Sequence, residues 1–412
     1  MKKQINRSVW LFILALVVAM AVAGCNKQSP QWTFIGDLSE GLFLVQDSTE
    51  KYGFIDKDGE VIIPCQWKAA NDFSEGMALV QDENDQYGFI DNTGKVVMPC
   101  KWKDASDFAD GLAFVQDENE KYGFIDKTGK VVVPFQWNSV EAFTDGLAMV
   151  RDDNNQCGII DKTGKLIVPC QWDNIYYFSE GLARVENADG VGFIDKTGKL
   201  VIPCKWNGAS EFQEGLASVL DGKERYGYID KTGVLVIPCR FSEPWNFSDG
   251  LAAVGNFDKA GVIDKTGKVV VPFIYKQINK YQEGLAVVQD ENEKYGFIDK
   301  TGNVIVPCKW FWADDFNQGL ARVRNDDGKY GIIDKSGGPV VPCKWTYIEL
   351  FSEDLAMVID ENERYGFIDK TGKVVIPCKW KGAKNFLEGR TIVVDDNDYQ
   401  HLIDKTGQMV GE

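Results

Sequence analysis

Apolar and polar residues alternate along most of the chain in short runs, and glycine or acidic clusters separate these runs. The pattern is plainest at residues 111–137. Alternation with period two over a few residues, bounded by turn residues, predicts short half-buried β-strands. We predict strands at 112–115, 122–126 and 130–134, and no stretch shows helical periodicity. The pattern does not predict the conformation of the connection that follows, as at 100–110. A short fourth strand is one alternative.

The same stretch returns every 34 or 35 residues, which the glycine of its Tyr-Gly-Phe-Ile-Asp element marks. This period indicates a tandem repeat array. One unit is too small to bury its own apolar face, so neighbouring units must cover it. The end copies are atypical and are predicted to act as caps. The marker glycines, with His401 in the same place of a degenerate eleventh copy, are Gly53, Gly88, Gly123, Gly158, Gly192, Gly227, Gly261, Gly296, Gly331 and Gly366.

These features predict an all-β fold, a tandem repeat array of antiparallel three-stranded units over residues 31–412. We expect an open superhelix or solenoid. The alternative is a β-propeller. Two observations argue against it: a unit of about 35 residues is short for a four-stranded blade, and eleven blades would be many.

Single positions of the repeat suggest structural roles. Asp126 opens the turn between the second and third strands, where a type I turn followed by Gly129 in the left-handed region fits, and its carboxylate can accept hydrogen bonds from its own turn. An aspartate in this place of every copy indicates a turn device rather than a catalyst. Pro134 is predicted to end the third strand. In 112–115 the second and fourth positions are almost always Ala and Val, which predicts that they face the core and that the variable third position faces outward.

The first residues differ from the rest. Residues 1–24 combine a basic start with a 15-residue apolar run, Val9 to Ala23, which is too short to span a bilayer comfortably and is typical of a secretory signal. Val22-Ala23-Gly24-Cys25 resembles the lipobox of bacterial lipoproteins, which implies cleavage before Cys25 and lipidation of that cysteine. Residues 25–30 would then be a short tether, and the protein would be exported and membrane-anchored in the bacterial cell envelope. Ordinary cleavage after Ala23, which would release a free secreted protein, is the alternative.

The composition narrows the classes of function. A net charge of −17 argues against nucleic-acid binding. The chain has one histidine, which excludes histidine-based catalytic triads and histidine metal clusters, and it has no P-loop, nucleophile elbow or dinucleotide motif. We therefore expect no enzyme activity, no catalytic residue and no cofactor. A hydrolase that uses paired carboxylates stays as the alternative, because the chain has 62 acidic residues.

Cysteine recurs directly after the strand-three proline. Zinc sites usually draw two ligands from a Cys-x2-Cys spacing, which is missing, so we expect no metal site there. Phe135 and Phe273 take the same place in two copies, which indicates an apolar pocket holding free thiols. Disulfides between neighbouring units are the alternative. Cys157 is a lone thiol outside the series, whose members are Cys65, Cys100, Cys170, Cys204, Cys239, Cys308, Cys343 and Cys378.

Tryptophan recurs three residues past the proline, as at Trp67, and we expect core packing, with an aromatic platform for a glycan as the alternative. The acidic turns such as 82–85 are expected to be solvated hairpin tips rather than calcium sites, since no EF-hand spacing is present. Trp245, Trp312 and His401 stand outside the regular pattern. We take Trp245 and Trp312 as possible ligand-contact residues.

The elements Tyr-Gly-Phe-Ile-Asp-Lys-Thr-Gly-Lys, Val-Ile-Pro and Phe-Ser-Glu-Gly-Leu-Ala resemble the bacterial WG-repeat family, also called KWG repeats. Tyr-Gly stands here where the family often has Trp-Gly. The resemblance implies a β-rich repeat protein of the kind common in bacterial envelopes, usually without assigned activity. We therefore expect a lipid-anchored, non-catalytic binding or scaffold protein whose partner is an envelope protein or a glycan.

Overall fold

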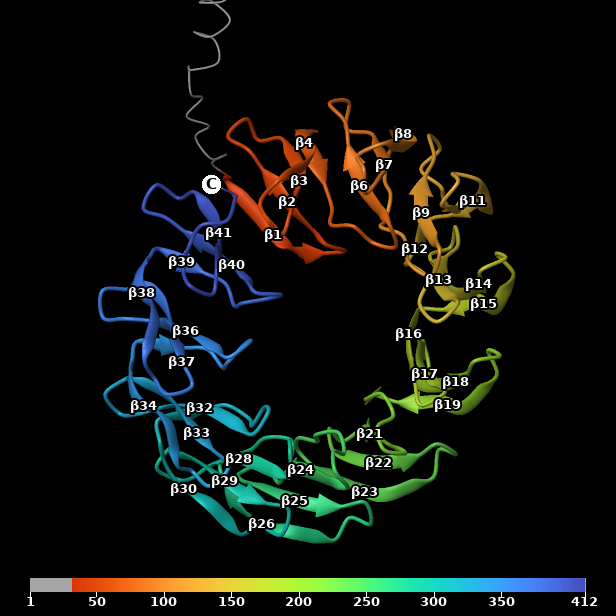
Figure 1. Ribbon diagram of the computed structural model, residues 1–412. Coiled ribbons are helices and arrows are strands. Elements are labelled where there is room, and N and C mark those ends of the chain that lie inside the picture. Colours follow the sequence, from red (N-terminus) through yellow and green to blue (C-terminus); the bar gives the residue numbers. More distant parts are fainter. Residues whose placement is uncertain (1–31, 412) are drawn as a thin grey trace, which may run out of the picture.

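The computed structural model describes residues 32–411, which form eleven antiparallel β-sheets arranged side by side in a closed ring (Figure 1). Eight sheets have four strands and three have three. We number these blades 1 to 11 along the chain. Within residues 32–411 no helix is present, and therefore none that could cross a membrane.

Each blade is a meander whose strands follow one another in chain order, and the first strand lies on the inside of the ring. Blades 1 to 3 comprise β1 (Phe34–Ser39), β2 (Leu42–Gln46), β3 (Tyr52–Asp56) and β4 (Val61–Trp67); β5 (Ala69–Ala70), β6 (Met77–Gln81), β7 (Tyr87–Asp91) and β8 (Val96–Trp102); and β9 (Leu112–Gln116), β10 (Tyr122–Asp126) and β11 (Val131–Trp137). Blades 4 to 6 comprise β12 (Ser139–Val140), β13 (Leu147–Arg151), β14 (Cys157–Asp161) and β15 (Leu166–Trp172); β16 (Asn174–Ser179), β17 (Leu182–Asn187), β18 (Gly190–Asp195) and β19 (Leu200–Trp206); and β20 (Gly208–Ala209), β21 (Leu216–Leu220), β22 (Tyr226–Asp230) and β23 (Leu235–Phe241).

The second half of the ring repeats this order. Blades 7 to 9 comprise β24 (Leu251–Gly255), β25 (Ala260–Asp264) and β26 (Val269–Tyr275); β27 (Gln277–Ile278), β28 (Leu285–Gln289), β29 (Tyr295–Asp299) and β30 (Val304–Trp310); and β31 (Trp312–Ala313), β32 (Leu320–Arg324), β33 (Tyr330–Asp334) and β34 (Pro339–Trp345). Blades 10 and 11 comprise β35 (Tyr347–Ile348), β36 (Leu355–Ile359), β37 (Tyr365–Asp369) and β38 (Val374–Trp380); and β39 (Gly382–Ala383), β40 (Arg390–Val394) and β41 (Gln400–Asp404).

The all-β repeat fold is thus confirmed, and the ring is the propeller alternative rather than the open superhelix. The unit fits a blade because its innermost strand is often only two residues long, as in β5, so that about 35 residues suffice. Eleven blades fit around one axis because the ring leaves an opening in the middle (Figure 1).

The third long strand of the unit runs past its proline, so the prediction that Pro134 ends it was wrong. β11 continues to Trp137, which pairs with Tyr122, and its register shifts between Tyr122 and Phe124. A proline is tolerated there because this strand is the outer edge of its blade and no further strand needs the missing N–H. The shifted strand passes so close that a Cβ on Gly123 would lie 2.6 Å from the Val133 carbonyl oxygen. This contact explains why glycine marks the repeat.

Both faces of a blade are covered by its neighbours. Ala78 and Val80 pack against residues of blade 1, whereas Leu79 between them packs against blade 3 and is 4% exposed. The variable third position of the strand therefore faces the next blade, and the prediction that it faces outward was wrong in this blade. A hydrophobic cluster of this kind joins each successive pair of blades.

An aromatic pair recurs at most of these interfaces. The ring at the centre of one blade's second long strand, such as Phe54, meets the ring at the inner edge of the next blade, such as Phe73, with centroids 4.8 Å apart. Tilted and edge-on geometries at this spacing are favourable for aromatic pairs. The other pairs, with centroids 4.6 to 5.0 Å apart, are Phe89–Phe108, Phe124–Phe143, Phe193–Phe212, Tyr228–Phe247, Phe297–Phe316 and Phe367–Phe386.

A carboxylate clamp also ties one blade to the next. Glu75 and Gly76 have φ of 53° and 81° and form the two-residue turn before β6. The Glu75 carboxylate accepts a hydrogen bond from the Gly111 N–H of blade 3 (3.0 Å) and pairs with Lys127 (3.1 Å). A left-handed glutamate costs about 1–2 kcal/mol, and hydrogen bonds to a charged group, worth about 1.5–3 kcal/mol each, offset this cost. The equivalent clamps are Asp110 with Gly146 and Lys162, Glu180 with Gly215 and Lys231, Glu214 with Gly250 and Lys265, Glu283 with Gly319 and Lys335, and Glu353 with Gly389 and Lys405.

The two ends of the described chain complete blade 11 together. The C-terminal end pairs Met409 with Ile403, and from the other end Trp32 pairs with Gln400, whose N–H donates to the Trp32 carbonyl (2.8 Å). Trp32 is 9% exposed and joins the cluster between blades 11 and 1. The last copy is thus completed by Trp32, which precedes the first copy, and the predicted caps are absent from the described chain.

Candidate functional site

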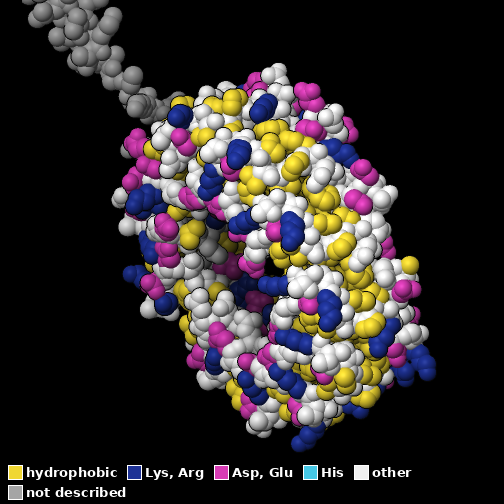
Figure 2. All heavy atoms as spheres, turned by 90° about the vertical axis from the view of Figure 1, so that its right-hand side faces the viewer, with side chains coloured by type: hydrophobic (Ala, Val, Ile, Leu, Met, Phe, Trp, Pro, Cys, Tyr) yellow, Lys and Arg dark blue, Asp and Glu magenta, His cyan; other side chains and the backbone are white. Residues whose placement is uncertain are grey.

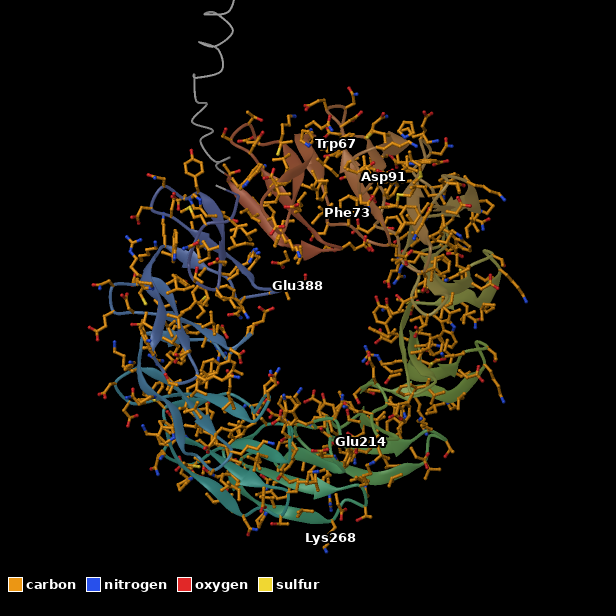
Figure 3. All side chains as sticks on the ribbon, in the orientation of Figure 1. Trp67, Phe73, Asp91, Glu214, Lys268 and Glu388 are labelled. Atoms are coloured by element: carbon orange, nitrogen blue, oxygen red, sulfur yellow. The ribbon has the colours of Figure 1, made fainter. Side chains whose placement is uncertain are left out.

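The inner edge of the ring carries positions at which the repeat varies from copy to copy. Two residues precede the inner aromatic residue of each blade, as Asn71 and Asp72 precede Phe73, and in blade 1 Leu38 takes the place of the aromatic residue. We call these two residues the inner-edge pair. In Figure 3, Phe73 and Glu388 lie on the side of the central opening, and Trp67 and Lys268 lie farther out. The pairs of blades 1 to 11 are Gly36-Asp37, Asn71-Asp72, Ser106-Asp107, Glu141-Ala142, Tyr176-Tyr177, Ser210-Glu211, Trp245-Asn246, Asn279-Lys280, Asp314-Asp315, Glu349-Leu350 and Lys384-Asn385.

Side chains of successive pairs contact one another around the ring. The Asn71 amide donates to the Asp107 carboxylate (3.1 Å), and the Asn279 amide donates to Asp315 (3.3 Å). At the ring closure, Lys384 donates to Asp37 (2.7 Å). At these three junctions the first residue of one pair therefore reaches the second residue of the next pair.

The inner edge is anionic, with eight acidic and two basic residues in the pairs. Burial is the largest cause that raises the pKa of Asp72, and the negative charges of Asp37 and Asp107 raise it further. Burial also raises the pKa values of Asp107 and Asp315. Figure 2 shows a hollow in which acidic and basic side chains gather. An excess of carboxylates attracts cationic groups and repels phosphates.

Trp312 and Trp245 both come from the inner side of their blades. Trp312, in β31, packs edge-on to Tyr330 with centroids 6.0 Å apart and is half-buried. Trp245 is 44% exposed and lines a cavity of about 140 Å³ together with Phe257, which is 71% exposed and has a φ of 77°. Trp245 is therefore accessible to a ligand, and its ligand-contact role stays a prediction, as does that of Trp312.

Arg322 neutralises the carboxylates beside Trp312. Its guanidinium donates to Asp314 through Nε (2.7 Å) and pairs with Glu349 (3.1 Å). The positive charge of Arg322 thus lies between two carboxylates of successive blades.

His401 occupies the marker-glycine place of blade 11. The crowding that requires glycine elsewhere is relieved there, because the outer strand of this blade is split between the chain ends. The His401 Nε2 lies 3.0 Å from the Asp395 Oδ2, and its ring lies 6.4 Å from that of Trp380. His401 thus contacts residues of its own blade and the neighbouring outer strand, and these contacts are structural.

The tryptophan series lies between the outer strands, and the core interpretation is confirmed. Trp137, Trp172, Trp345 and Trp380 are buried, and Trp102 stacks on Phe135 of the next blade with centroids 5.7 Å apart. The enclosed Nε1–H groups have no hydrogen-bond partner among the described residues, so they present no donor at the surface: Trp67, Trp102, Trp137, Trp172, Trp206, Trp310, Trp345 and Trp380. The glycan platform therefore has no support from this series.

The cysteines from Cys65 to Cys378 are free thiols, as predicted, and Cys157 is buried while the others are half-buried. Cys100 packs in the cluster that contains Trp67 of the preceding blade. Burial raises the pKa of Cys65 to about 11. Cys25 and the signal segment 1–24 lie outside the described residues.

The carboxylates of the turns hold the backbone. The Asp126 Oδ1 accepts hydrogen bonds from the Thr128 N–H (2.9 Å) and the Lys130 N–H (3.1 Å), and Gly129 has a φ of 82°, which confirms the predicted turn. In the acidic tips, Asp117 caps its own turn in the same way. Across residues 32–411, no three potential ligands gather in a metal-binding group.

The interface between blades 4 and 5 keeps its hydrophobic cluster but lacks both the aromatic pair and the carboxylate clamp that join most other blades. Ile159 stands where an aromatic ring would face Phe178, and Phe178 is half-buried. Asp145 and Lys196 occupy the clamp positions, but no bond within residues 32–411 joins them.

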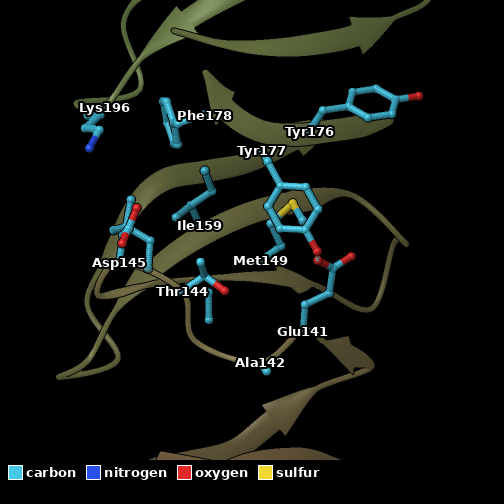
Figure 4. A pocket seen from close by; sticks show the side chains of 12 residues that line it. Glu141, Ala142, Thr144, Asp145, Met149, Ile159, Tyr176, Tyr177, Phe178 and Lys196 are labelled. Carbon is cyan, nitrogen blue, oxygen red and sulfur yellow. Dashed lines mark hydrogen bonds between the residues drawn. The ribbon is translucent and has the colours of Figure 1, made fainter. Parts of the chain in front are cut away.

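A cavity of about 110 Å³ lies at this interface and includes all four of these residues in its lining. Figure 4 shows Ile159 near its centre, with Asp145 and Lys196 on one side and Glu141 and Tyr177 on the other. The Tyr177 hydroxyl, on a side chain 63% exposed, donates to the Glu141 carboxylate (3.1 Å). This hydrogen bond is the main cause that raises the pKa of Tyr177.

The sequence did not single out the inner-edge pairs or this cavity. One signal was present: when the copies are aligned with one another, these two positions vary between copies, as do the two positions that directly follow the tryptophan place. The replacement of Phe by Ile159 was also visible, but its consequence depends on which blades touch.

Comparison with known proteins supports the repeat assignment. The family model described as "WG containing repeat" matches residues 52–85, 87–122, 122–155, 158–190, 192–223, 226–256, 261–295, 295–330, 330–362 and 365–399. No curated protein shows a significant match to the chain.

Similar solved structures include three with low sequence identity. A computationally designed protein, Ika8, is 12% identical, with 64% of this chain and 95% of that chain covered and a TM-score of 0.32. A structure titled eukaryotic initiation factor is 13% identical, covering 73% and 95%, with a TM-score of 0.39. BamB from Moraxella catarrhalis is 11% identical, covering 64% and 92%, with a TM-score of 0.34. The ten matched repeats cover most of the chain, and the protein therefore belongs to the WG containing repeat family.

Proposed function

We propose that the protein is a non-catalytic binding or scaffold protein of the bacterial cell envelope, anchored to a membrane by lipidated Cys25. The observation that carries the binding role is the contrast between a constant frame and a varied inner edge. Residues that hold the ring recur from blade to blade, whereas the inner-edge pairs range from Gly36-Asp37 to Tyr176-Tyr177. Varied polar and aromatic side chains on a rigid frame are typical of a recognition surface.

The partner that this surface favours is a protein with basic groups. The excess of acidic residues in the inner-edge pairs attracts cations, and the tryptophans that a glycan platform would need are packed between blades.

Photo-crosslinking in the native bacterium tests the binding role. A photoreactive phenylalanine analogue replaces Tyr177 or Asn71 at the inner edge. The control replaces Val234, which is 59% exposed and occupies in blade 6 the place that Lys268 occupies at the outer rim in Figure 3. We expect one discrete protein adduct from the inner edge and none from position 234. Equal labelling from all three positions, or none from any, would contradict the proposal.

The anchor is tested separately by Cys25→Ser. We expect the wild-type chain to incorporate a fatty-acid label and to sediment with membranes, and the variant to do neither. A wild-type chain that stays in the soluble fraction without label would refute the anchor and leave the binding role standing.

The alternative is an envelope glycan hydrolase. Asp72 and Asp107, whose pKa values burial raises, are the neighbouring carboxylates that such an activity would use. Release of reducing ends from envelope glycan by the wild type, and its loss in D72N, would establish this alternative in place of the non-catalytic role.

A further inference from the structure

The cavity between blades 4 and 5 exists because one aromatic ring is missing. At the next interface, Phe193 of blade 5 packs on Phe212 of blade 6 with centroids 4.9 Å apart, whereas Ile159 of blade 4 leaves Phe178 of blade 5 without that partner. Blade 7 shows that a small residue need not leave a gap. There Val262 faces Tyr281, which is 3% exposed and donates its hydroxyl to the Asp299 carbonyl (3.1 Å).

The walls of the cavity suit an apolar ring. Met149, Ile159 and Phe178 line its inner part, together with Leu147 and Ala148. A closed apolar cavity of about 150 Å³ holds a benzene ring, and this smaller cavity opens to solvent, so that a ring can enter its apolar part from outside. An unpaired buried hydroxyl costs about 1–3 kcal/mol. A sugar ring would bury several hydroxyls against these side chains, so the lining disfavours a saccharide.

Charged side chains also line the cavity and can contact a ligand. Glu141 receives only the Tyr177 hydroxyl among the hydrogen bonds of the described chain, so one of its oxygens is left for a ligand. Asp145 also lines the cavity, and Lys196 is the one basic residue of the lining. A cation that follows the inserted ring on the Tyr177 side would meet the Glu141 carboxylate and the face of an exposed tyrosine.

We propose that this cavity binds an aromatic side chain of a partner protein, with a basic residue next to that side chain in sequence contacting Glu141. The inference rests on the proposed binding function and names the chemistry of its partner. The partner's ring takes the place that a phenylalanine of blade 4 would fill.

The second gap in the ring makes a matched control. Between blades 9 and 10, Ile332 again replaces the aromatic residue, and Phe351 is half-buried. The cavity at this interface is lined by Phe351 and, at its rim, by the ion pair of Lys370 with Asp354 (2.6 Å) together with Gln318 and Glu353, whereas Ile332 does not line it. An apolar side chain would have to desolvate these groups, so this second gap is a poor socket.

The test uses the full ring and three capped dipeptides: acetyl-Phe-Lys-amide, acetyl-Phe-Glu-amide and acetyl-Ser-Lys-amide. Saturation-transfer NMR reports which dipeptide contacts the protein. We expect transfer to the phenylalanine ring of the first, weaker transfer to the second and none to the third. Ile159→Phe fills the cavity from inside and should weaken binding of the first dipeptide at least about tenfold, the effect of about 1.4 kcal/mol of lost ring burial. Ile332→Phe should leave binding unchanged, and E141Q should remove the preference for Lys over Glu.

The following results would overturn the proposal: no transfer from the wild type to any dipeptide, equal binding by I159F and the wild type, or equal loss in I332F. Transfer to N-acetylglucosamine that I159F abolishes would replace the aromatic partner with a glycan. The thermal unfolding transition of I159F shows whether this variant is folded. E141Q leaves the apolar lining of the cavity unchanged, so its dipeptide preference is an independent measurement. If these tests fail while position 177 still crosslinks to a protein, the socket is wrong and the binding function stands.

Discussion

The aromatic pairs between blades lead us to predict that Ile159→Phe stabilises the protein. The substitution supplies the ring that Phe178 lacks and fills a cavity of about 110 Å³. At about 24 cal/mol per Å³ of cavity, complete filling would be worth about 2.6 kcal/mol. An aromatic pair adds about 0.5–1.5 kcal/mol, whereas strain from an imperfect fit subtracts about 1–3 kcal/mol, so we expect a net gain of about 1–2 kcal/mol. The mirror substitution, Phe193→Ile, removes one ring of an existing pair and should cost about as much as a full cavity of this size.

Urea denaturation followed by tryptophan fluorescence measures both variants. Because a ring of eleven blades need not unfold in one step, the comparison rests on the shift of the first transition at constant slope. I159F should move this transition to higher urea, and F193I to lower urea. A destabilised I159F would show that the wild-type interface is already full, which would refute the missing-ring explanation of the cavity. A neutral F193I would show that the aromatic pairs do not hold the blades together.

Three further predictions follow from the contacts between blades. Trp32→Ala should destabilise the whole ring by about 3–5 kcal/mol, as much as Trp345→Ala in an internal blade, whereas in an open array it would loosen only one end. Stability should fall on acidification: Lys335 lowers the pKa of Glu283 and Thr301 lowers that of Asp299 to about 2. Stability from these groups is complete above their unfolded pKa values near 4 and is lost as pH falls toward 2, and E283Q should show a smaller loss in thermal melts. Burial raises the pKa of Cys308 to about 11, so the nine described thiols should react slowly with a disulfide reagent at pH 8 and fast in urea; fast reaction of the folded protein would contradict this packing.

Local features of the fold were predictable from the sequence. The strand positions, the Asp126 turn with its left-handed Gly129 and the packed tryptophans depend on contacts within a unit or on simple periodicity. The free thiols followed from the phenylalanines that replace them in two copies.

Long-range geometry was not predictable in the same way. Whether the array closes depends on a small rotation between blades, and Trp32 lies outside the unit that it completes. Pro134 was taken as a strand end because periodicity does not show that its strand is an outer edge. The cavity beside Ile159 required knowledge of which residue of the next blade lies opposite.

Small-angle X-ray scattering tests the closed ring most directly. An open stack of eleven sheets at about 10 Å spacing would be about 110 Å long, with a radius of gyration of about 32 Å or more. A compact chain of this length has a radius of gyration of about 22 Å, and a ring with an opening lies slightly above that value. The account predicts a radius below 28 Å (roughly midway) with a symmetric distance distribution. A long-tailed distribution with a radius above about 30 Å would contradict the ring.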